Sequence, residues 1–163
     1  MNTNSLKIYT VEEATKKLEY YCSYQERCHY EVVEKLKEMK MIPQVIDNIV
    51  VHLIENNFLN EERFAQSFAR GKHNIKKWGK IRIVNELKFR NISKYNIDTA
   101  LKEIPSETYY SNFHELAEKH WNSITEKNSQ KKKKKFCDFL LRKGWESNLI
   151  FEKLTDLEAS QNQ

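Results

Sequence analysis

Glycine, proline and cysteine are all scarce in this chain of 163 residues, with three, two and three copies respectively. Glycine and proline are frequent in the turns of loop-rich and strand-rich folds. In this chain the apolar residues recur at intervals of three and four residues instead of alternating. The sequence therefore predicts an all-α protein. Its 39% of hydrophobic residues are sufficient for a packed core.

The chain also lacks an uncharged apolar run of the roughly 18 residues that a membrane span needs. Its first ten residues, MNTNSLKIYT, have neither the charged start nor the apolar centre of a signal peptide. We therefore expect a folded cytoplasmic protein with no membrane partner.

The residues for a metal site or a catalytic centre are missing too. Cys22, Cys28 and Cys137 cannot all pair and lack the close paired spacing of a zinc site, so we predict reduced thiols in or near the core. His114 and His120 are too few to complete a ligand set. The chain has no glycine-rich phosphate loop, no HExxH and no GxSxG. We expect no metal, no cofactor and no enzymatic activity.

Positive charge is concentrated in two segments of the sequence. Residues 70–94 hold nine Lys or Arg against one acid, and residues 127–143 hold eight against one. The net charge of the whole chain is only +5, so the remaining residues are predominantly acidic. Two such basic islands favour a partner that is long and negatively charged.

An internal repeat relates three parts of the chain. When Leu36, Leu87 and Leu140 are placed in one column, at offsets of 51 and 53 residues, seven columns are apolar in all three copies. A repeat of this length indicates stacked helical units. Units of about 50 residues bury too little surface to be stable alone, so neighbouring units should pack together.

We therefore predict three tandem three-helix repeats, resembling helix-turn-helix units, stacked into an elongated, curved, right-angled array. The predicted units are residues 8–57, the basic residues 58–105 and residues 106–158, followed by a disordered tail at 159–163. The first helix of the third unit is marked by the residues Tyr110, Phe113, Ala117, Trp121 and Ile124.

Polar and glycine residues mark the ends of the predicted helices. Thr10 with Glu13, Asn60 and Ser93 fit the first positions of helices, where their side chains accept backbone hydrogen bonds. Asn57, Asn91 and Gly144 fit the stops, because these residue types tolerate the left-handed backbone conformation.

The stretch KKWGKIRIVNELKFRN, residues 76–91, contains the second helix of the middle unit. By helical spacing Ile83, Val84 and Leu87 lie on one side, and the basic residues form a separate face. Two interpretations of Trp78 remain open, namely packing between units and stacking on a nucleic-acid base or a partner's side chain.

The third unit contains a run of five lysines, residues 131–135. The apolar residues Phe136, Phe139 and Leu140 follow it directly, so we predict that the run opens a folded helix. Cations at a helix N-terminus oppose the helix dipole. We therefore expect an external anion, such as a phosphate or a partner's carboxylate, to offset their charge.

The middle unit contains four short segments in a fixed order and spacing: NFLNEERFA (57–65), FARGK (68–72), KKWGKIRI (76–83) and ELK (86–88). In this order and spacing they resemble the RecX family of bacterial recombination regulators. Asn57 and Asn91 stand where the family commonly has Gly, and Cys28 stands where a capping Ser or Thr is usual. The three-copy organisation extends the resemblance to about residues 8–158.

The resemblance implies a protein that binds the filament of the RecA recombinase on DNA, within its helical groove. It implies inhibition of RecA's ATPase, of strand exchange and of filament growth, and hence modulation of homologous recombination and DNA repair. Direct contact with single- or double-stranded DNA is also implied. We expect a monomer, since the internal repeats already supply an extended surface.

The predicted RecA- and DNA-binding residues are the basic residues of the two islands together with one tryptophan. They are Arg70, Lys72, Lys76, Lys77, Trp78, Lys80, Arg82, Lys88, Arg90, Lys131, Lys132, Lys133, Lys134, Lys135, Arg142 and Lys143. The alternative hypothesis is a DNA-binding helical protein that acts on free nucleic acid, because three-helix units are also common among DNA readers.

Overall fold

The structure is a computed structural model that describes residues 7–163. Within these residues it contains nine helices and no strand, which confirms the all-α prediction. The helices are α1 (Val11–Tyr24), α2 (His29–Glu38), α3 (Pro43–Glu55), α4 (Glu61–Asn74), α5 (Lys80–Phe89), α6 (Lys94–Leu101), α7 (Ser106–Ser123), α8 (Ser129–Lys143) and α9 (Ser147–Gln161). Residues 1–6, part of the segment considered for a signal peptide, lie outside the described residues.

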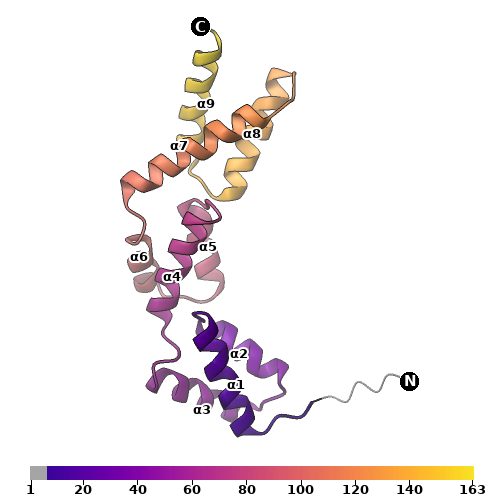
Figure 1. Ribbon diagram of the computed structural model, residues 1–163, viewed down its shortest axis with the longest axis vertical. Helices are drawn as coiled ribbons and strands as arrows, with labels where there is room; N and C mark the ends of the chain where they lie inside the picture. Colours follow the sequence, from indigo (N-terminus) through magenta and orange to yellow (C-terminus); the bar gives the residue numbers. More distant parts are fainter. Residues whose placement is uncertain (1–6) are drawn as a thin grey trace, which may run out of the picture.

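The helices form three units that follow one another along the long axis of the molecule (Figure 1). The first unit contains α1 to α3, the second α4 to α6 and the third α7 to α9. The middle unit is set back from its neighbours on one side, so the array is elongated and bent (Figure 1). Within residues 7–163, no helix is long and apolar enough to cross a membrane.

The predicted disordered tail at residues 159–163 is wrong for most of its length. Helix α9 continues to Gln161. Its last turns are held because Leu157 packs against the core and Glu158 forms an ion pair with Lys133 of α8. No glycine or proline interrupts the helix there.

Local side-chain chemistry accounts for where several helices begin. Thr10 and Glu13 form the predicted capping box at α1, and Asn60 accepts a hydrogen bond from the Arg63 N–H at the start of α4. Ser93 caps α6 in the same way. At Cys28, the Glu31 carboxylate accepts the backbone N–H at 3.2 Å.

The predicted left-handed stops are present. Asn57 has a φ of 61°, Asn91 a φ of 58° and Gly144 a φ of 89°. Asparagine tolerates this conformation better than most residues, which explains how it can stand where the RecX family commonly has glycine.

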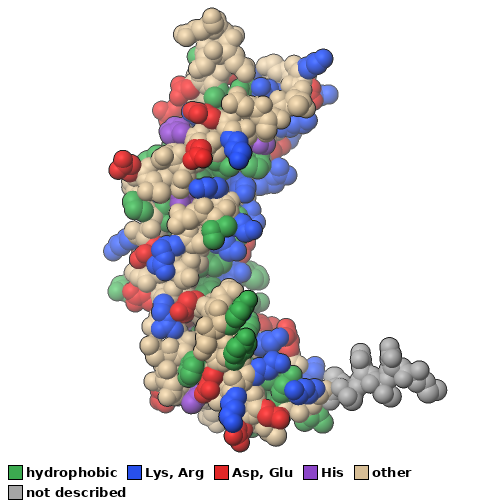
Figure 2. Space-filling view, in the orientation of Figure 1, with side chains coloured by type: hydrophobic (Ala, Val, Ile, Leu, Met, Phe, Trp, Pro, Cys, Tyr) green, Lys and Arg blue, Asp and Glu red, His purple; other side chains and the backbone are tan. Residues whose placement is uncertain are grey.

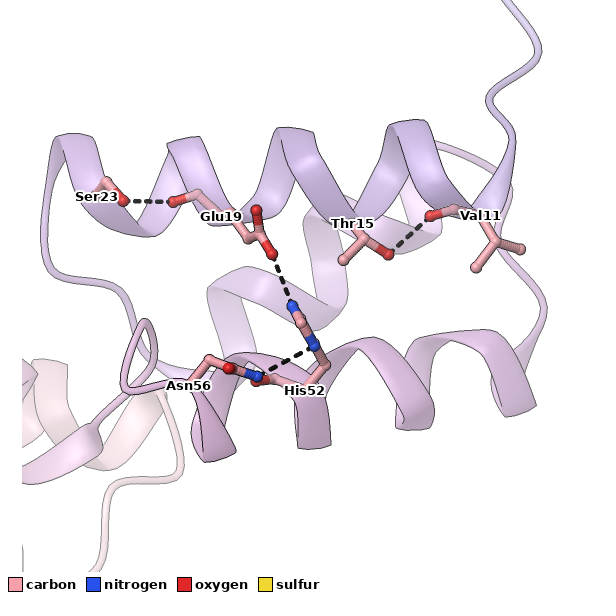
Figure 3. A network of polar contacts seen from close by, with 6 residues as sticks. All are labelled: Val11, Thr15, Glu19, Ser23, His52 and Asn56. Atoms are coloured by element: carbon pink, nitrogen blue, oxygen red, sulfur yellow. Dashed lines mark hydrogen bonds and ion pairs between the residues drawn. The ribbon is translucent and has the colours of Figure 1, made fainter.

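The first unit has a hydrophobic core of its own, which includes Leu18 of α1, Leu36 of α2 and Leu53 of α3. A polar clamp joins α1 and α3 at its surface (Figure 3). There His52 donates its Nε2–H to Glu19 at 2.7 Å and accepts a hydrogen bond from the Asn56 amide on Nδ1 at 3.2 Å.

The second and third units share one hydrophobic core. It runs from Phe64 in α4 through Leu87 in α5 to Phe113 in α7 and Trp145 before α9. These two units therefore form a single packed body, whereas the first unit packs mainly on itself.

The joint between the first and second units is mostly polar. Arg63 Nε donates to Glu26 at 2.6 Å, and the His29 backbone N–H donates to Glu61 at 3.1 Å. The apolar contributions are few, and they include Cys28, which is buried in the core of the second and third units.

The joint between the second and third units is a close contact of two backbones. The Gly79 N–H donates to the Lys143 carbonyl at 2.8 Å, and the Ile81 N–H donates to the Gly144 carbonyl at 3.1 Å. A Cβ atom on Gly79 would overlap the Gly144 carbonyl, and one on Gly144 would overlap Arg82. Both glycines are therefore required by this approach.

We predict that Gly144→Ala lowers the free energy of unfolding by about 2 kcal/mol or more, because it adds a left-handed penalty to the overlap with Arg82. Urea unfolding followed by circular dichroism measures the change. Gly71→Ala is the matched control, because a Cβ there meets no atom within 4 Å. It should raise the free energy of unfolding by up to about 1 kcal/mol, since alanine favours the helix. Equal effects of the two substitutions would contradict this account of the joint.

Candidate functional site

The two basic islands of the sequence meet at the joint between the second and third units. Lys143 Nζ, at the end of α8, donates to the Lys76 carbonyl at 2.8 Å. Arg82 Nη1, in the first turn of α5, donates to the Arg142 carbonyl at 3.1 Å. The sequence left open whether the islands share a face, and these contacts bring the end of one against the start of the other.

Seven cations gather around this joint, and we call them the basic ridge. They are Lys72, Lys76, Lys77, Lys80, Arg82, Arg142 and Lys143. None of them takes part in an ion pair with an acidic residue of the described chain. Figure 2 shows Lys and Arg side chains gathered along the edge of the upper half of the molecule, over α5 and α8.

Like charges lie close to Lys143, one member of the ridge. Burial lowers the pKa of Lys143 from its ordinary value, and the neighbouring cations Arg82 and Lys76 lower it further. An anion placed here would relieve this repulsion.

Trp78 is partly buried and packs against the core that the second and third units share. Its ring makes an edge contact with Phe68, with the centroids 6.2 Å apart. The Arg82 guanidinium lies 4.0 Å from the ring centroid and Lys72 Nζ lies 5.0 Å from it. The tryptophan therefore positions two cations of the ridge through cation–π contacts.

A buried histidine, His73, connects the segment that carries the ridge to α7. His73 is fully buried, its Nδ1 lies 2.9 Å from the Trp78 carbonyl, and its Nε2 lies 2.9 Å from the Asn112 amide nitrogen of α7. The amide donates to Nε2, so the imidazole is neutral and its Nδ1–H donates to the carbonyl. Stacking on Tyr109, at 5.3 Å between ring centroids, completes the contact between the units.

Tyr109 is the second buried polar group at this joint. Its hydroxyl donates to Glu146 at 2.6 Å and accepts the Lys80 backbone N–H at 3.0 Å. Burial, and then the hydrogen bond to Glu146, raise the pKa of Tyr109 far above its ordinary value, so the hydroxyl keeps its proton. The Lys80 ammonium lies over its ring at 4.6 Å from the centroid.

The sequence analysis did not single out Tyr109 and used Tyr110 to mark this helix. Tyr110 is 48% exposed, whereas Tyr109 is 2% exposed. Both residues are at helical spacing from Phe113, three and four positions away, so periodicity could not separate them.

The lysine run at the start of α8 does not need the external anion that we expected. Lys133 pairs with Glu158, Lys134 with Asp138, and Lys135 with Glu126 at 3.7 Å. Lys132 lies over the Trp121 ring at 4.1 Å from its centroid. Carboxylates of the third unit itself therefore offset most of this charge, and Lys131 remains exposed.

The other predicted site residues lie apart from the ridge. Arg70 pairs with Glu103 at 2.8 Å, and Arg90 pairs with Glu86 at 2.8 Å. Lys88 is exposed on α5. The charges of Arg70 and Arg90 thus contribute to contacts within the protein.

The thiols and the potential metal ligands show no shared site. Between residues 7 and 163, no three His, Cys, Asp or Glu residues are grouped so that they could hold a metal ion. Burial raises the pKa of Cys22 and that of Cys28 to about 11, which keeps both thiols protonated and unreactive at neutral pH.

The fold and this surface define a tandem array of three-helix units with a basic surface at one joint. Two family models match the chain: the second three-helix domain of RecX over residues 60–101 and the third three-helix domain of RecX over residues 107–154. The chain belongs to the RecX family of regulatory proteins.

Relatives in sequence and in structure agree with this assignment. Regulatory protein RecX of Bacillus cytotoxicus is 28% identical over 142 residues, which are 87% of this chain and 53% of that protein. The Bacillus thuringiensis protein of the same name is 27% identical over 146 residues, 88% of this chain and 54% of its own. This chain thus spans about half the length of the curated relatives that it matches.

Two crystal structures have the same fold. RecX from Lactobacillus salivarius superposes with a TM-score of 0.73 at 25% identity, covering 91% of this chain and 97% of that one. A second regulatory protein RecX has a TM-score of 0.74 at 24% identity, covering 89% of this chain and 74% of that one.

We predict that stability falls as the pH drops below about 6.5, the ordinary pKa of histidine. Burial holds the pKa of His73 below that value, and the nearby Lys77 and Lys80 lower it further. The unfolded chain therefore takes up the proton first, and the free energy of unfolding decreases between pH 6.5 and the lower pKa of the folded state.

Urea unfolding at several pH values between 8 and 5 measures this dependence. His73→Gln is the comparison, because it removes this titration and retains the other histidines. The variant should lose part of the pH dependence whatever its absolute stability. Identical slopes for the variant and the original chain would assign the effect to other groups.

Proposed function

We propose that this chain regulates homologous recombination and DNA repair by binding the RecA–DNA filament through its basic ridge. Binding inhibits RecA's ATPase, strand exchange and filament growth. The observation that carries the proposal is the gathering of seven cations without acidic partners on one joint of a chain that belongs to the RecX family. The protein acts in the cytoplasm as a monomer, without a cofactor and without catalysis of its own.

The ridge suits a filament because it combines unneutralised charge with a fixed shape. A cation that already has a carboxylate partner gains little binding free energy from an external anion. The cations of the ridge have no such partner, so an external anion can stabilise them. The shared core of the second and third units keeps the two basic islands together. An elongated array can also contact more than one protomer of a filament, as repeat proteins do on extended partners.

Direct binding of free DNA is the second candidate function, and the same seven cations support it. The phosphates of single- or double-stranded DNA can neutralise the positive charge of the ridge as well as an acidic protein surface can. The two functions differ in their contacts. Free DNA offers phosphate contacts to the ridge, whereas a filament adds contacts with protein.

We predict that substoichiometric amounts of this protein inhibit the ATPase of the cognate RecA on single-stranded DNA. A variant with Lys72, Lys76 and Arg142 changed to Glu should need at least about tenfold more protein, since each charge lost at a surface contact costs up to about 1 kcal/mol. Steady-state ATP hydrolysis during titration measures the shift.

The matched control changes Lys16, Lys102 and Lys119 to Glu, which reverses as many exposed charges away from the ridge. It should inhibit like the original chain. Equal loss in both variants, with circular dichroism showing both folded, would place the contact elsewhere. Inhibition only at amounts that coat the DNA would favour direct DNA binding.

We predict different salt dependences for the two functions. If the ridge neutralises about six phosphates of free duplex, a plot of log affinity against log salt should have a slope near −5. Binding to the RecA filament should show a shallower slope, because part of its free energy comes from apolar and polar protein contacts. Fluorescence anisotropy from about 50 to 200 mM salt covers the range in which such slopes separate clearly. Equal slopes would argue that only DNA is contacted.

A further inference from the structure

A surface pocket of about 290 Å³ lies between α4 and the segment that follows α1. Along α4 its wall contains Phe64, Phe68, Gly71 and Ile75, and Glu26 lines the opposite side. The volume is at the small end of the range for ligand sites, which is roughly 300–1,000 Å³. It suits one or two large side chains better than a cofactor.

The pocket follows one face of a helix and is open because that face contains a glycine. Its residues on α4 are spaced by three and four positions, so they line up along the helix. A Cβ on Gly71 would meet no atom within 4 Å and would project into open space. Because Gly71 lines the pocket, we expect a larger side chain at this position to occupy part of it.

The wall contains Gln25 and Ser67 as well as apolar side chains. Among the apolar ones, Ile75 is 77% exposed, Phe68 is half-buried and Phe64 is buried. The Phe64 and Phe68 rings lie 5.6 Å apart between centroids. Apolar surface that is left open beside charged residues is typical of a binding site. An apolar side chain inserted here would remove this surface from water.

The rim of the pocket is basic. Lys72 and Lys76, two members of the basic ridge, line it. The Glu26 charge on the opposite side is balanced by Arg63, whose Nε donates to Glu26 Oε1 at 2.6 Å. The other oxygen, Glu26 Oε2, is buried and has no donor among the described residues.

We propose that this pocket binds one large apolar side chain, such as Phe or Leu, carried on an acidic segment of a partner protein. The apolar part of the wall takes the side chain, and Lys72 and Lys76 attract the flanking carboxylates. An aromatic anchor in a pocket with a charged rim is a common arrangement at protein interfaces. The pocket's chemistry defines this occupant independently of which protein the basic ridge contacts.

Fluorescein-labelled synthetic peptides test the proposal. The first peptide has one Phe with three Asp on each side, the second has Ala in place of Phe, and the third has Lys in place of each Asp. Fluorescence anisotropy should show that the Phe–Asp peptide binds at least about tenfold more tightly than the Ala peptide, because burying a Phe ring is worth that much or more. The Lys peptide should bind more weakly still.

Two protein variants locate the binding. Gly71→Leu places a large side chain in the lining of the pocket, where a Cβ meets no atom within 4 Å, and should weaken binding of the Phe–Asp peptide at least about tenfold. Asn74→Leu places the same side chain at an exposed position of α4 outside the pocket and should leave binding unchanged. Thermal unfolding confirms that both variants fold, which is expected because leucine is the better helix former.

The opposite results overturn the proposal. Equal binding of the Phe and Ala peptides, or no binding of the Phe–Asp peptide at millimolar concentration, excludes an apolar anchor. Equal binding of the Lys peptide excludes an acidic partner. If a thymidine oligonucleotide binds and Gly71→Leu abolishes that binding instead, the pocket takes a nucleobase. RecA is absent from this experiment, so its outcome does not depend on the ATPase result.

Discussion

The close approach of Gly79 and Gly144 is the constraint on which the rest of this structure depends. Two backbone hydrogen bonds cross at this point, from the Gly79 N–H to the Lys143 carbonyl and from the Ile81 N–H to the Gly144 carbonyl. They form only because neither glycine has a Cβ and because Gly144 has a left-handed backbone conformation. This contact fixes the start of α5 against the end of α8. It thereby joins two basic segments that lie about sixty residues apart in the sequence into one surface.

The two joints between the units differ in chemistry, and this difference divides the array into two bodies. The second and third units share an apolar core and a buried polar network around His73 and Tyr109. The first unit has its own core and meets the second through ion pairs such as that of Arg63 with Glu26. Polar contacts at a surface contribute little stability compared with a shared core. The first unit should therefore separate from the second more easily than the second from the third, and the pocket beside α4 lies at this weaker joint.

The number of cations in a segment does not by itself identify a binding site for an anion, as the lysine run and the ridge show. Residues 131–135 form the densest group of cations in the chain, yet Lys133, Lys134 and Lys135 each face a carboxylate of their own unit. The ridge has a lower charge density in the sequence, but its members have no acidic partner within residues 7–163. Free positive charge, rather than total positive charge, determines the field that an anionic partner experiences. The middle unit is thus better suited than the lysine run to contact phosphates or carboxylates.

The sequence by itself determined the helices, their number in each repeat and most of their ends, because these depend on local periodicity and on caps such as Thr10, Asn60 and Gly144. It also determined the residues from which any basic surface had to be built. Only the tertiary structure decided that Tyr109 is buried in place of Tyr110, that Lys133 is paired, and that Arg82 lies against Arg142. These outcomes depend on contacts between residues tens of positions apart. Such contacts are set by the angle and the close approach of neighbouring units, which the spacing of apolar residues along one helix does not specify.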